Sequence, residues 1–152
     1  MIRLYYAVLP PASAMTLHEG GRALLRRVLG IQEEELRFAP GGKPWVPGKP
    51  AFNLSHSGRL VLLAVSGAGE IGCDVEDSAR NLRNPERLRR KIAGPGEDGE
   101  PVLALWVKKE AQYKSGLPGG AAFSFSLPGG YLAAVCCEAL PDPIPTPERI
   151  LL

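Results

Sequence analysis

The sequence predicts one domain of the α+β class. Its 152 residues match the usual size of a single domain. Apolar residues make up 45% of the chain, which is enough for a hydrophobic core and argues against wholesale disorder. Short runs of β-branched and aliphatic residues alternate with stretches of helical periodicity, so we expect both strands and helices.

The first elements are a strand and an amphipathic helix. Residues 2–9 are rich in aliphatic and aromatic side chains, and two prolines end this predicted strand. A helix over 16–29 follows, with Thr16 as N-cap and Glu19 completing a capping box. Gly30 is typical of a helix C-terminus, so we expect the helix to stop there.

The middle of the chain predicts short strands joined by turns. Residues 40–50 hold four prolines and three glycines and predict a rigid, exposed loop. Around Ser55-His56-Ser57-Gly58 we expect a turn, which would make 51–66 a hairpin. The strands predicted in this region are 36–38, 51–54, 60–65 and 70–76.

The last third predicts two helices and a hairpin. A short helix starts at Pro85 with Asn84 as its cap, and a stronger one covers 102–115 before Gly116. Strands at 121–127 and 131–138, separated by Pro-Gly-Gly, form the predicted hairpin. The proline-rich tail 141–152 is expected to be extended or disordered.

Composition excludes several classes of protein. With 18 basic and 16 acidic residues the net charge is +2, which excludes binding of nucleic acid by charge alone. Three cysteines, two of them adjacent, fit neither a disulfide framework nor a structural zinc site. We recognise no signal peptide and no apolar stretch long enough to cross a bilayer, so we expect a cytoplasmic protein that does not bind membranes.

Asp74 and Glu76 form the first candidate site. Side chains two residues apart on a strand point to the same face, so both carboxylates project together. Close carboxylates repel each other, and a hard divalent cation removes that repulsion. Two solvated acids at a strand end are the alternative interpretation.

The predicted helix 102–115 carries the second candidate site. Trp106, Glu110 and Lys114 are spaced i, i+4 and i+8 and therefore share one face. An ordinary salt-bridged surface would produce the same pattern.

The third candidate site combines Ser55, His56 and Ser57 with Lys43 and Pro44. Hydroxyls, an imidazole, turn amides and a nearby ammonium suit an anionic phosphate. The alternatives are an Asn/Ser turn with an exposed histidine and a Ser/His nucleophile pair. The nucleophile pair is disfavoured because neighbouring side chains point apart and no GxSxG elbow is present.

Taken in order, these motifs resemble the signature of the 4′-phosphopantetheinyl transferases, in particular their larger, monomeric class, which activates peptide synthetases such as the surfactin synthetase. The resemblance covers residues 42–116, about half the chain. Its motifs are Gly42-Lys43-Pro44, Phe52-Asn53-Leu54-Ser55-His56-Ser57, Gly72-Cys73-Asp74-Val75-Glu76, and Trp106 with Lys109-Glu110-Ala111 and Lys114.

The resemblance implies a fold and a reaction. The fold would be a single α+β domain over 1–140, with pseudo-twofold-related halves at 1–65 and 66–140 and the ligand cleft between them. The reaction would move the phosphopantetheine arm of coenzyme A onto a serine of an acyl or peptidyl carrier protein, releasing adenosine 3′,5′-bisphosphate. The implied protein is a monomer that depends on Mg²⁺.

The resemblance also implies residue roles. Asp74, Glu76 and Glu110 would hold Mg²⁺, and Asp74 would count with Glu110 and Lys114 as catalytic. Glu110 would be the general base, and Lys114 would neutralise or protonate the leaving phosphate. Coenzyme A would be bound by Lys43, Pro44, Ser55, His56 and Lys109.

Three hypotheses remain open at the level of sequence. The first is an active transferase. The second is a degenerate relative that binds coenzyme A or a carrier protein without turnover, because the part before Phe52 is short and offers only Arg22, Arg26 and Arg27 for the 3′-phosphate. The third is an unrelated metal-dependent phosphohydrolase. The basic segment 80–91 fits either an acidic carrier protein or a solvated helix face.

Overall fold

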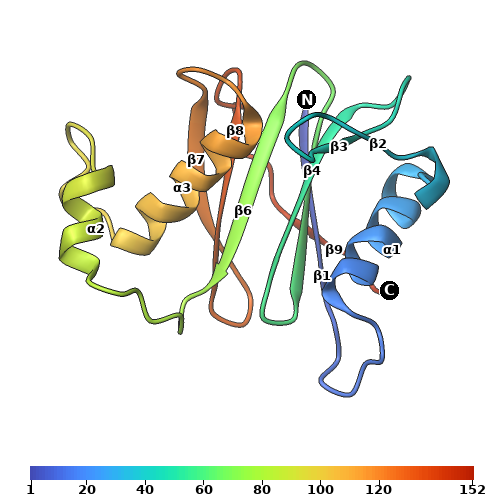
Figure 1. Cartoon of the computed structure of the whole chain (residues 1–152), viewed down its shortest axis with the longest axis horizontal. Coiled ribbons are helices and arrows are strands. Elements are labelled where there is room, and N and C mark those ends of the chain that lie inside the picture. Colours follow the sequence, from blue (N-terminus) through green and yellow to red (C-terminus); the bar gives the residue numbers. More distant parts are fainter.

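A computed structural model describes all 152 residues and places two largely antiparallel sheets next to each other (Figure 1). The first sheet has the order β4-β5-β1-β9 and the second β6-β8-β7. The strands of the first are β1 (Ile2–Val8), β4 (Ala51–Ser57), β5 (Leu60–Ser66) and β9 (Glu148–Arg149). Those of the second are β6 (Ile71–Asp77), β7 (Ala121–Leu127) and β8 (Tyr131–Cys137). The α+β class predicted from the sequence is confirmed.

Helices cover one side of each sheet. In Figure 1, α1 (Leu17–Leu29) lies on the first sheet, α3 (Val102–Ser115) lies on the second, and α2 (Pro85–Ile92) packs against α3 at the far edge. The predicted caps of the first two helices are present: Thr16 and Glu19 form the capping box, and the Asn84 side chain accepts from Arg87 N. No helix in the chain is both long and apolar enough to span a membrane.

One apolar core joins the two sheets. Every residue of β5 is buried, and its alternate side chains serve different layers. Leu60, Leu62 and Ala64 pack with β6 and β8 residues such as Val75 and Val135, whereas the side chains between them pack under α1. Because the shared core fixes the sheets relative to each other, polar groups at the boundary between them are held in place.

The middle of the chain corrects two sequence predictions. Residues 55–57 belong to β4 and not to a turn, and the turn is at Gly58, whose φ is +58°. A Cβ at Gly58 would lie 2.5 Å from the Tyr131 hydroxyl, so the turn needs glycine. The loop predicted over 40–50 contains β3 (Pro44–Trp45), which pairs with β2 (Arg37–Phe38). Proline is tolerated there because a two-residue edge strand leaves one side free of partners.

The tail also contains a short strand that pairs with the first sheet. β9 runs parallel to β1, with Tyr5 opposite Glu148, and the amide of Ile150 donates to Tyr6 O at 2.8 Å. Ile150 packs against the core under α1. The tail therefore adds a fourth strand to the first sheet.

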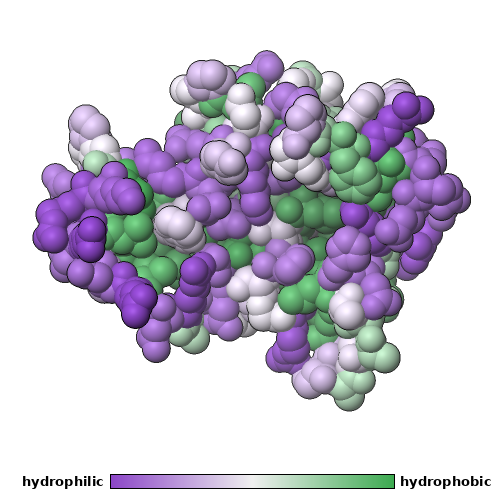
Figure 2. All heavy atoms as spheres, viewed as in Figure 1, coloured by the Kyte–Doolittle hydropathy of each residue, from purple (hydrophilic) through white to green (hydrophobic).

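The surface carries its hydrophilic side chains unevenly. Figure 2 shows them gathered at both ends of the view, over α2 at the left and beside α1 at the right. Arg87, Arg90 and Lys91 are exposed on this helix, whereas Leu88 and Ile92 are half-buried and lie on the side toward α3. The predicted basic segment is thus an amphipathic helix with a cationic outer face.

Candidate active site

The candidate site lies where β4 and β6 run side by side at the facing edges of the two sheets (Figure 1). The strands share no backbone ladder. Instead, side chains at alternate positions of β4 accept hydrogen bonds from backbone amides at alternate positions of β6. We call this row of hydrogen bonds the seam. Its three bonds run from Cys73 N to Asn53 Oδ1 (2.9 Å), from Val75 N to Ser55 Oγ (3.2 Å) and from Asp77 N to Ser57 Oγ (3.1 Å).

A fourth hydrogen bond closes the seam at Cys73. Its Sγ lies 3.2 Å from Asn53 O. Burial raises the pKa of the Cys73 thiol to about 12, so the sulfur keeps its proton and donates to the carbonyl. This cysteine is therefore a structural donor and not a reactive thiolate.

Asp74 projects from β6 against α3 and is only 7% exposed. Its Oδ1 accepts from Ser55 Oγ at 3.2 Å and lies 3.3 Å from Lys114 Nζ. Its Oδ2 is buried without a hydrogen-bond partner in the protein. Burial raises the pKa of Asp74, and the Lys114 ammonium opposes that rise. The site thus holds a buried carboxyl with one oxygen that no protein group satisfies.

The close approach of α3 depends on Gly72. A Cβ at this position would overlap Ala111 O and Ser115 N, both backbone atoms of α3. Because glycine has no side chain, the helix lies directly on β6, and Lys114 reaches Asp74.

Glu76 lies two residues further along β6, on the same face as Asp74. Arg80 donates to its Oε1, and Ser57 Oγ lies 3.5 Å from its Oε2. The Arg80 guanidinium also lies 6.0 Å from the centre of the Trp106 ring. A cation therefore accompanies each carboxylate: Lys114 for Asp74 and Arg80 for Glu76.

Glu110 is on α3, one turn from Lys114 and one turn from Trp106. Because those two residues contact Asp74 and Arg80, respectively, the helix face that carries Glu110 is directed toward β6. Glu110 is half-buried, and its side chain forms no hydrogen bond or ion pair with the protein. No three His, Cys, Asp or Glu side chains gather closely enough to form a metal cluster. The structure thus brings Asp74 together with Lys114, and it does not gather Asp74, Glu76 and Glu110 around one point.

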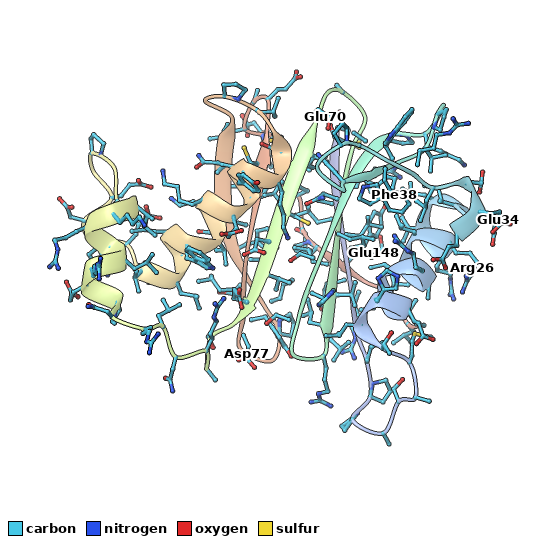
Figure 3. All side chains as sticks on the ribbon, viewed as in Figure 1. Arg26, Glu34, Phe38, Glu70, Asp77 and Glu148 are labelled. Atoms are coloured by element: carbon cyan, nitrogen blue, oxygen red, sulfur yellow. The ribbon has the colours of Figure 1, made fainter.

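Lys43 and Pro44 line two neighbouring hollows near the start of β6. The larger, about 470 Å³, also touches Asn53, Tyr113 and Lys114. Lys43 Nζ donates to Ile71 O at 2.6 Å and to Glu70 Oε2 at 3.1 Å. In Figure 3, Glu70 and Asp77 mark the two ends of β6, so Lys43 contacts the end opposite Asp77.

Two predicted ligand-binding residues are neighbours on β4 and differ in exposure. Ser55 is buried, and its hydroxyl is already engaged by Val75 N and Asp74. His56, the next residue of β4, is exposed. The interpretation of Ser55 as part of a turn missed its partner, because nothing local in the sequence shows that β6 lies beside β4.

Lys109 lies apart from Asp74, in a small hollow of about 110 Å³ that Glu97 and Lys108 also line. Lys108 bridges Glu97 at 3.3 Å and Glu100 at 2.9 Å. A hydrogen bond from Gly94 N lowers the pKa of Glu97. Burial alone would lower the pKa of Lys108, but its hydrogen bonds to Glu100 and Glu97 raise it overall.

The fold and site define an α+β protein with a buried carboxylate-lysine pair at the junction of two sheets. No protein-family model matches the chain. The chain is 34% identical over 114 residues to a 4′-phosphopantetheinyl transferase AcpT from Salmonella typhimurium, covering 68% of this chain and 58% of that protein. It is 36% identical over 114 residues to the protein of the same name from Escherichia coli K12, with 68% and 57% covered.

A more distant relative carries a related name. A putative 4′-phosphopantetheinyl transferase, slr0495 of Synechocystis, is 30% identical over 125 residues, with 70% of this chain and 51% of that protein covered. These relatives support the 4′-phosphopantetheinyl transferase superfamily as the family of the chain. The chain spans little more than half the length of the curated relatives it matches.

Proposed function

We propose that the chain transfers the 4′-phosphopantetheine arm of coenzyme A to a serine of an apo acyl or peptidyl carrier protein and releases adenosine 3′,5′-bisphosphate. The observation that carries this proposal is Asp74, buried against Lys114 with one oxygen unpartnered. The names of the relatives support the same reaction. The larger, surfactin-synthetase-activating class and a cytoplasmic monomer stay predictions.

The donor set fits a magnesium ion that shares its coordination with substrate. Mg²⁺ in proteins is usually held by one or two carboxylates together with phosphate oxygens and water. Asp74 Oδ2 and Glu76 would supply those carboxylates from one face of β6, with Glu110 as a further candidate. When bound, the ion would neutralise charge on the diphosphate of coenzyme A.

The reaction needs a proton acceptor and a cation, and α3 offers both. In the proposed step, the serine oxygen of the carrier bonds to the β-phosphorus, and the diphosphate P–O bond breaks. Glu110 takes the hydroxyl proton, since it is half-buried and has no ion-pair partner. Lys114 neutralises or protonates the departing phosphate from its position beside Asp74.

Binding of coenzyme A is proposed for the hollow next to Lys43 and Pro44, between the halves 1–65 and 66–140. Lys43 and Lys114 both line it, so two ammonium groups face the same space. His56, which is exposed, would contact a phosphate. Contact of coenzyme A with Ser55 and Lys109 stays a prediction. It is less favoured because the Ser55 hydroxyl is already bonded to Asp74 and because Lys109 lines a different hollow.

The alternative is a catalytically degenerate module that binds coenzyme A or a carrier protein. It is favoured by one observation: Asp74, Glu76 and Glu110 do not gather around one point, so the residues do not form a closed set of metal ligands.

One assay separates these functions. The full chain is incubated with coenzyme A, Mg²⁺ and several apo carrier proteins, and the carriers are weighed by mass spectrometry. A gain of about 340 Da, the mass of the transferred arm, supports the transferase. Tight binding of coenzyme A with no gain on any carrier supports the binding module, and release of inorganic phosphate supports a phosphohydrolase.

Asp74→Ala is the matched variant for that assay, and Asp142→Ala is its control, since Asp142 is an exposed acid of the tail. Loss of turnover is expected only in Asp74→Ala. A wild-type rate in Asp74→Ala would remove Asp74 from the site.

A further inference from the structure

The seam joins two strands that do not pair through their backbones. β6 pairs with β8 on one edge, and its amides on the other edge point toward β4. Buried amides need acceptors, and here every second side chain of β4 supplies one. Each acceptor lies 20 residues before its donor, so the strands run parallel and in a fixed register.

Two of the three seam side chains also contact the carboxylates. The Ser55 hydroxyl donates to Asp74 Oδ1 at 3.2 Å, and the Ser57 hydroxyl donates to Glu76 Oε2 at 3.5 Å. A serine hydroxyl has one proton to donate and lone pairs to accept with. Each hydroxyl thus accepts from a β6 amide and donates to the carboxylate of the residue beside it.

Because each hydroxyl makes both hydrogen bonds, the orientation of the carboxylate depends on the register of β4 and β6. A carboxylate held by one hydrogen bond still rotates about its χ angles. When the donor is itself anchored to the backbone next to the carboxylate, the donor cannot follow that rotation. Partners of this kind orient ligating carboxylates in metal sites generally.

We propose that Ser55 and Ser57 are positioning residues that set the orientation of Asp74 and Glu76 across the seam. This inference rests on the proposed function for the ion that the two carboxylates hold. It makes Ser55 a hydrogen-bond partner of Asp74, in place of the contact with a coenzyme A phosphate that the resemblance implies.

Ser57 is the better residue to test, because it is half-buried whereas Ser55 is buried. Ser57→Ala removes both hydrogen bonds, and Ser57→Thr keeps the hydroxyl. Ser126→Ala is the matched control, since Ser126 is an exposed strand serine on β7 with no hydrogen bond from its side chain. If Ser57→Ala does not fold, Ser57→Cys, with a weaker donor of similar size, replaces it.

The first readout is amide hydrogen exchange followed by NMR. Asp77 N donates to Ser57 Oγ, so Ser57→Ala should speed its exchange by about tenfold, with Ser57→Thr and Ser126→Ala close to wild type. Unchanged exchange of the Asp77 amide in Ser57→Ala would show that Ser57 does not accept from this amide, and it would overturn the proposal.

The second readout is binding of Mn²⁺, a spectroscopic substitute for Mg²⁺, measured by electron paramagnetic resonance with coenzyme A present. A positioning role predicts about tenfold weaker binding in Ser57→Ala and recovery in Ser57→Thr. Faster Asp77 exchange with wild-type Mn²⁺ affinity would reduce Ser57 to a structural role and overturn the proposal.

The two proposals fail in different ways. If the wild-type chain binds no Mn²⁺ with coenzyme A and transfers no arm, the proposed function fails and takes the positioning role with it. If wild type binds and transfers but Ser57→Ala matches it in Mn²⁺ affinity, only the positioning role fails.

Discussion

Replacing Gly72 with alanine should push α3 away from β6. A Cβ at this position would lie inside 3.0 Å of Ala111 O and Ser115 N, and 2.9 Å from Lys114 C, whereas ordinary contact begins at 3.4 Å. All three are backbone atoms of one helix, so no side-chain rotation relieves the overlap. The helix must move as a body by about 1 Å, because repulsion rises steeply inside contact distance.

The energetic cost follows from that displacement. Forcing an extra methyl group into a packed core costs about 1–3 kcal/mol. For a chain of this size, each kcal/mol lowers Tm by about 2–4 °C, so a fall of about 2–12 °C is expected. Since α3 also carries Lys114, which lies 3.3 Å from Asp74, the same shift misplaces the proposed catalytic groups. A misplacement of about 1 Å costs on the order of 100-fold in rate.

Thermal unfolding and carrier-protein turnover measure the two effects separately. Gly99→Ala is the matched control, because a Cβ there meets no atom within 4 Å and φ is not positive. It should melt and turn over like wild type. If Gly72→Ala also melted at the wild-type temperature, α3 would not lie on β6 as described, and the placement of Lys114 would lose its basis.

Three further predictions concern single groups. Glu110→Gln should lower kcat much more than it raises the Kd of coenzyme A, and equal losses in turnover assays and calorimetry would make Glu110 an organiser of the pocket. Tyr131→Phe should lower the free energy of unfolding, measured in urea, by about 1 kcal/mol. The Tyr131 hydroxyl accepts from Arg59 N at 3.0 Å, and the variant removes this acceptor. Lys108→Met should cost about 0.5–1 kcal/mol and change the pH dependence of unfolding. The stability from the raised pKa of Lys108 is complete below pH 10.5 and is lost as pH rises through the folded-state pKa. The stability from the lowered pKa of Glu97 is complete above pH 4.5 and is lost as pH falls through the folded-state pKa. A variant whose stability falls with alkaline pH as steeply as wild type would disprove the Lys108 contribution.

Local signals in the sequence were sufficient for most elements. The capping box at Thr16 and the cap at Asn84 predicted two helix starts, and both are present. The final hairpin also forms as predicted, with Ala121 opposite Cys137. In each case the deciding interaction joins residues close in sequence, or a turn whose residues favour one geometry.

The prediction failed where a distant strand decided the structure. Ser55 and Ser57 have the composition of a turn, because such side chains commonly bond to their own backbone. In the structure their partners are amides 20 residues away, and the strand continues through them. The pattern itself held a signal, since polar side chains at every second position of a strand share one face. That these side chains bond to β6 could not be inferred from the sequence, because it does not show that β6 has an unpaired edge beside β4.

The same reasoning explains why the carboxylates were easier to find than their partners. Asp74 and Glu76 are two residues apart, so their shared face follows from strand geometry alone. Lys114 reaches Asp74 only because Gly72 lets α3 lie against the backbone, and Arg80 reaches Glu76 through the chain leaving β6. Each carboxylate is therefore neutralised by a cation from a different element. A ligand that binds the two carboxylates through a metal ion must compete with those cations or reorient them, so its binding should strengthen when Lys114 or Arg80 is engaged by substrate phosphates instead.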